Sequence, residues 1–85
     1  MVICYYQKTA NNENLIAMYN LGICYIYGIC VCKNDEIAFE YFKRAAYREY
    51  LHGITMLGYC YRQGIGTRID KRKAFELLKL VINHN

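Results

Sequence analysis

Residues 17–29 read AMYNLGICYIYGI, and residues 53–65 read GITMLGYCYRQGI. When the chain is shifted by 36 residues, the two stretches align without a gap and share Leu-Gly, Cys-Tyr and Gly-Ile at the same spacing. The match continues downstream, where residues 38–40 and 74–76 both read Ala-Phe-Glu. Internal similarity at a fixed period of this size is typical of proteins built from stacked supersecondary units. The sequence therefore predicts a duplicated unit.

Each unit is expected to form two helices. Apolar residues recur every four positions from Ala17 to Tyr25, which is the spacing of one helix face. Gly28 is expected to end this helix, because glycine adopts the left-handed conformation at low cost. A second helix is expected after Asn34, and after Asp70 in the second unit, because their side-chain oxygens can cap the first turn. Such a hairpin cannot bury both apolar faces alone, so we predict an all-α solenoid of stacked antiparallel helix pairs.

Composition and charge narrow the class of protein. The chain has 85 residues, of which 55% are hydrophobic and 21% charged, so it is one small folded domain rather than a disordered tail. The net charge of +4 divides unevenly, with −2 on residues 1–42 and +6 on residues 43–85. A basic half could attract nucleic acid, but its cations are scattered among apolar residues. A solvated helix surface explains this pattern, and we expect no nucleic-acid partner.

An uncharged stretch from Asn14 to Cys32 has nearly the length of a transmembrane helix. It favours an alternative function, a small membrane-associated protein that uses residues 14–32. Three tyrosines within the stretch oppose that interpretation. The corresponding part of the second unit also contains His52 and Arg62. Membrane association is therefore the weaker of the two interpretations.

Small and apolar residues recur in a fixed pattern, which in the first unit reads Ala17-x-x-x-Leu21-Gly22-x-x-Tyr25-x-x-Gly28, then Ala38, then Ala45-Ala46. This pattern resembles the Sel1-like repeat, a relative of the tetratricopeptide repeat. The resemblance implies one domain over residues 1–85, with repeats at 15–50 and 51–83 and a partial repeat helix at 3–10. It also implies a protein–protein interaction module that serves as an adaptor or scaffold.

Two departures from the family pattern bear on structure. Cys30 stands where the second unit has Gly66, so the first turn is expected to be looser or reshaped. In the last helix, residues 80–82 read Leu-Val-Ile in place of the usual small pair. These large apolar residues leave too few polar positions for a solvated end of the array. We therefore predict self-association through the terminal helix, or missing repeats.

The cysteines predict packing rather than chemistry. Five cysteines cannot all pair within one chain, and Cys24 and Cys60 occupy equivalent helical positions. Cys30 and Cys32 are the only close pair, and a structural zinc site needs four ligands, so we expect no metal. No catalytic set and no phosphate-binding glycine loop can be assigned, so we expect neither enzyme activity nor a cofactor. Reduced thiols favour a cytoplasmic location.

By the resemblance, the first helix of each unit lines a concave surface that binds a partner. The lining positions would be Ile16, Tyr19, Ile23 and Ile26, repeated as His52, Thr55, Tyr59 and Arg62. Their spacing places each set on one stripe of its helix. The first set is apolar and the second polar, aromatic and basic, which suits an extended or helical peptide with an apolar anchor and a carboxylate near Arg62. Alternatively, Ile23 and Ile26 simply pack against a neighbouring unit.

Overall fold

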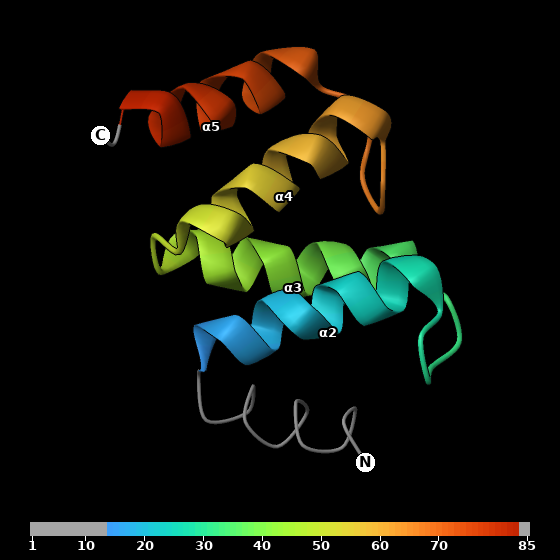
Figure 1. Ribbon diagram of the computed structural model, residues 1–85. Coiled ribbons are helices and arrows are strands. Elements are labelled where there is room, and N and C mark those ends of the chain that lie inside the picture. Colours follow the sequence, from blue (N-terminus) through green and yellow to red (C-terminus); the bar gives the residue numbers. More distant parts are fainter. Residues whose placement is uncertain (1–13, 84–85) are drawn as a thin grey trace.

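The computed structural model describes residues 14–83, in which four helices and no strand are present (Figure 1). These helices are α2 (Leu15–Tyr27), α3 (Asp35–Tyr47), α4 (Leu51–Gln63) and α5 (Lys71–Asn83). Each helix packs against the next, and α2 also touches α4. This part of the chain is an all-α solenoid of two antiparallel helix pairs, which confirms the predicted fold. The partial helix predicted at residues 3–10 lies outside the described residues.

The second helix of each unit begins after the predicted residue, and α2 ends at Gly28 as predicted. The side chains of Asn34 and Asp70 each accept a hydrogen bond, at 3.1 Å, from the backbone N–H three residues further on. Asn14 caps α2 in the same way at 2.8 Å. At the other ends, Gly28 and Gly64 adopt left-handed φ values of 66° and 73°. All four helices have 13 residues.

The turns inside the two helix pairs have the same backbone. In each turn, the N–H of the residue before the second helix donates to a carbonyl of the first helix, at 2.9 Å from Asn34 and 2.8 Å from Asp70. Cys30 has a φ of 62°, close to the 71° of its equivalent, Gly66. The prediction of a looser or reshaped first turn is therefore wrong. The cysteine is instead held in a conformation that is normally left to glycine.

The main core lies between the two helix pairs. It consists of residues from α2, α3 and α4, namely Ile26, Ala38, Phe39, Phe42, Leu57 and Cys60. Glycines let the helices approach closely. A Cβ atom on Gly22 would lie 2.5 Å from the Phe42 ring, and one on Gly53 would lie 2.6 Å from the Cβ of Ala45. The core thus joins the two repeats into one unit.

Within residues 14–83, no helix is both long enough and apolar enough to cross a membrane. The helix inside the uncharged stretch, α2, has 13 residues and is followed by a turn.

Candidate functional site

Aromatic side chains meet where α2 and α4 lie side by side. The rings of Tyr19 and His52 have centroids 5.5 Å apart. Tyr50 completes the group, at 6.2 Å from Tyr19 and 5.4 Å from His52. His52 is exposed, while the two tyrosines are half-buried. The structure therefore brings together Tyr19 and His52, one predicted lining residue from each repeat, although they are far apart in sequence.

Sequence reasoning missed Tyr50. It occupies the N-cap position of α4 but makes no side-chain cap hydrogen bond, unlike its repeat equivalent Asn14. Its ring packs against Tyr19 and His52 instead. The only sign in the sequence is a tyrosine where a capping residue is expected. That sign indicates a lost cap, but it does not reveal the contact with α2.

The other predicted lining residues differ in their accessibility. Ile16 is 59% exposed and Tyr59 is 43% exposed. Thr55 is also exposed, and its hydroxyl donates to the Leu51 carbonyl at 3.0 Å. These three side chains are open to a partner and lie on the same two helices as Tyr19 and His52. We call the surface formed by Tyr19, Tyr50, His52 and Tyr59 the α2–α4 face.

Ile26 and Arg62 occupy equivalent positions in the two repeats, but their surroundings differ. Ile26 is only 8% exposed and belongs to the core with Leu57. It is not available to a partner, because side chains of α3 and α4 pack around it. Ile23 is half-buried against the same core. Arg62 is exposed, and it lines a hollow with residues of α5.

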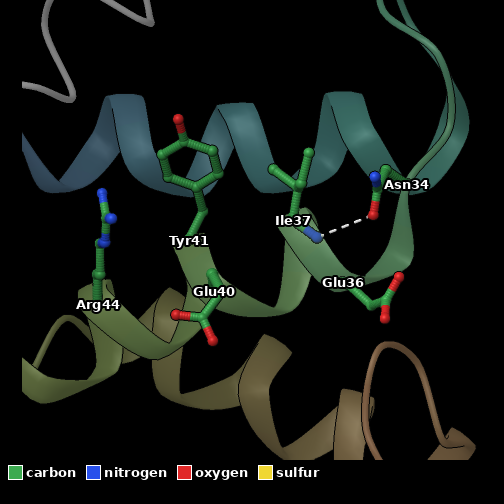
Figure 2. Close-up of a pocket in the computed structure, with 6 residues that line it drawn as sticks. All are labelled: Asn34, Glu36, Ile37, Glu40, Tyr41 and Arg44. Atoms are coloured by element: carbon green, nitrogen blue, oxygen red, sulfur yellow. Dashed lines mark hydrogen bonds between the residues drawn. The ribbon is translucent and has the colours of Figure 1, made fainter.

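A separate hollow of about 350 Å³ lies on α3 (Figure 2). Its lining residues are Asn34, Glu36, Ile37, Glu40, Tyr41 and Arg44. The Tyr41 ring stacks on Tyr25 of α2 at 6.1 Å, and the Arg44 guanidinium lies 5.6 Å over the Tyr41 ring. Figure 2 shows the Glu36 and Glu40 carboxylates turned away from α2, and both residues are exposed. No cysteine, serine or histidine lines this hollow.

The equivalent cysteines Cys24 and Cys60 are buried, whereas Cys30 and Cys32 are exposed. Burial raises the pKa of the Cys60 thiol to about 12, and the Asp35 carboxylate adds to this effect. Burial, with a smaller contribution from Cys30, also raises the pKa of Cys24. Both thiols therefore stay protonated and unreactive at neutral pH. In the part of the chain that the structure describes, no three His, Cys, Asp or Glu side chains gather as metal ligands would.

The buried Cys60 thiol should make the free energy of unfolding fall at alkaline pH. The unfolded chain loses the thiol proton near the ordinary pKa of 9.0, whereas the folded chain keeps it until about 12. Above pH 9 the unfolded state binds fewer protons, so the free energy of unfolding should fall by up to about 1.4 kcal/mol per pH unit. Urea unfolding between about pH 8 and pH 10 measures this slope. The slope should flatten in Cys60→Ala and not in Cys32→Ala, and equal slopes in both variants contradict the assignment.

The two stacked antiparallel helix pairs define a helical-repeat protein. The chain belongs to the Sel1 repeat family. The model of the Sel1 repeat matches residues 15–50 and again residues 51–82. Sel1 repeats are generally protein–protein interaction modules, and the fold is a non-enzymatic scaffold.

A solved structure has the same fold. It is the Sel1 repeat protein from Oxalobacter formigenes, which is similar to this chain with a TM-score of 0.94 and 24% sequence identity. The similarity covers 98% of this chain and 63% of that protein, so this chain spans less than two thirds of that protein's length. Among curated proteins, no sequence matches this chain.

Proposed function

We propose that the chain is an adaptor that binds a segment of a protein partner on the α2–α4 face. The observation that carries this proposal is the aromatic group of Tyr19, Tyr50 and His52, which joins the two repeats on one surface. Exposed aromatic side chains at a junction between repeats provide large contact areas at low entropic cost. The family assignment supports the same class of function.

The partner segment that suits this face has an apolar or aromatic anchor. The exposed His52 lies beside the half-buried Tyr19, so a side chain inserted there would contact rings on both repeats. Tyr59 is exposed further along α4. The mechanism is recognition without chemistry on the partner, so the chain is proposed not to be an enzyme. We also propose a cytoplasmic location, which the unpaired thiols of Cys30 and Cys32 favour.

Self-association through α5 stays a prediction. The exposed side chains of Phe75 and Ile82 support it. The cations Lys71, Arg72 and Lys79 weaken it, because two copies of α5 would bring like charges together. Any dimer formed in this way should therefore strengthen as salt screens the repulsion.

The binding experiment selects peptides that bind the 85-residue chain from a random-peptide display library. Selected peptides should carry an aromatic or apolar anchor. Their affinity for Thr55→Arg/Tyr59→Ala, measured by fluorescence anisotropy, should be at least about tenfold lower than for the wild type, because one exposed ring is lost and a bulky cation is added.

Tyr47→Ala is the matched control, because Tyr47 is an equally large ring, 75% exposed, on α3. It should leave the affinity unchanged. If the selected peptides bind Thr55→Arg/Tyr59→Ala as tightly as the wild type, the α2–α4 face is not the binding surface.

A further inference from the structure

A hollow of about 370 Å³ is lined by residues from the end of α4 and from α5. We call it the terminal socket, and its lining residues are Arg62, Lys71, Ala74, Phe75 and Leu78. Phe75 is 68% exposed, so no other part of the described chain covers its ring. An exposed ring on an apolar floor gains free energy when another surface buries it.

The same five positions in the first repeat form a filled site. The equivalent residues, 36 positions earlier, are Ile26, Asp35, Ala38, Phe39 and Phe42. Their four apolar members are buried in one cluster together with side chains of α4. The first repeat is therefore a template for the terminal socket. It indicates that a helix can pack on the socket in the way that α4 packs on α3.

The contacts of α4 show which of its positions enter the filled site. Leu57 and Cys60 lie in the shared cluster, and the Tyr61 ring meets Phe39 edge-on with centroids 5.5 Å apart. The turn that follows Cys60 lies against the start of α3, since a Cβ atom on Gly66 would collide with the Asp35 carbonyl oxygen. Burial, and with it the nearby Asp35 carboxylate, raises the pKa of the Cys60 thiol. A helix docked in the same way on the terminal socket would therefore direct its equivalent of Cys60 towards the residue that replaces Asp35.

Two replacements reverse the electrostatics of the terminal socket. Arg62 stands in place of Ile26, and Lys71 stands in place of Asp35. No acidic side chain lines the socket. Covering two cations with a neutral helix would remove water from them without compensation, which is unfavourable. The occupant must therefore bring negative charge.

We propose that the terminal socket binds an amphipathic helix of a partner protein. This helix carries apolar residues at the positions equivalent to Leu57 and Tyr61, and a carboxylate at the position equivalent to Cys60. The apolar residues cover Phe75, and the carboxylate pairs with Lys71. This site lies at the end of the array and is distinct from the α2–α4 face.

A second copy of this chain fits the socket less well. Its α2 is the helix that corresponds to α4, but residues 14–32 contain no charged side chain. The α2 positions equivalent to the docking residues, Leu21 and Cys24, are already buried. A contact between two α5 helices would oppose Lys71 and Arg72 of each copy. Charge therefore selects an acidic helix from another protein, and its binding should weaken as salt rises.

The test uses the 85-residue chain and synthetic peptides of residues 50–69 in which Cys60 is replaced. The Cys60→Glu peptide should bind about tenfold more tightly than the Cys60→Gln peptide, as measured by fluorescence anisotropy. Lys71→Glu in the chain should abolish this preference and favour a Cys60→Lys peptide. Glutamate is favourable in the first turn of a helix, so this variant keeps its fold. Tyr47→Ala, on α3, should bind both peptides as the wild type does.

Equal binding of the Cys60→Glu and Cys60→Gln peptides would overturn the proposal, and so would no binding of either. Analytical sedimentation of the chain alone shows whether it is a monomer or a dimer, which is a further test of the proposal. A dimer that Phe75→Ser dissociates means that a second copy occupies the socket, which also overturns the proposal. A monomer that binds the Cys60→Glu peptide preferentially, and less tightly at high salt, supports it.

Discussion

Replacing Phe42 with alanine should lower the free energy of unfolding by about 3–5 kcal/mol. The Phe42 side chain is completely buried, and its ring fills the space left by Gly22, where a Cβ atom would come within 2.5 Å. It belongs to the cluster that joins α2 and α3 to α4. The truncation leaves a cavity in a core that both repeats share. Urea unfolding followed by circular dichroism measures this loss.

Phe75→Ala is the matched control for Phe42→Ala. Phe75 is also on the second helix of a repeat, but it is 68% exposed. Its truncation should change the free energy of unfolding by less than about 1 kcal/mol, because little apolar surface is lost from the folded chain. Similar losses in the two variants contradict the core assigned here.

Gly66→Ala should lower the free energy of unfolding by about 2–4 kcal/mol. Gly66 has a φ of 71°, which an alanine adopts at a cost of about 1–2 kcal/mol. The added Cβ would also collide with the Asp35 carbonyl oxygen and lie 2.8 Å from the Cβ of Phe39. Because the clashing oxygen is part of the α3 backbone and cannot rotate away, the turn after α4 must move away from the first repeat. Thermal unfolding followed by circular dichroism measures the effect.

Cys30→Gly tests the equivalent backbone position in the first repeat, and here the substitution should raise stability. Cys30 has a φ of 62° and is exposed. Glycine relieves the left-handed strain, so stability should rise by about 1 kcal/mol. A loss of stability in Cys30→Gly, or none in Gly66→Ala, contradicts the equivalence of the two turns.

The repeat made most of the fold predictable. Each predicted cap is a local interaction, so the sequence around Asn34, Asp70 and Gly28 was sufficient to place it. The stacking of the two units also followed from the sequence, because two apolar hairpins of the same length must cover one another.

The candidate site was less predictable, because its contacts depend on how the helices cross. Helical spacing placed Ile26 on the same stripe as Tyr19, yet the approach of α4 buries Ile26 and leaves Tyr19 half-exposed. The contact of Tyr50 with α2 spans about one repeat of sequence and has no local pattern. Arg62 differs from Ile26 because no helix of the described chain follows α5.

The most direct test of the central proposal is a chemical-shift titration of the ¹⁵N-labelled chain with a library-selected peptide. We predict that the largest shifts fall on the backbone amides of Tyr19, Tyr50, His52 and Tyr59, on both repeats at once. Shifts confined to α3 and α5, or to one repeat alone, would contradict binding on the α2–α4 face.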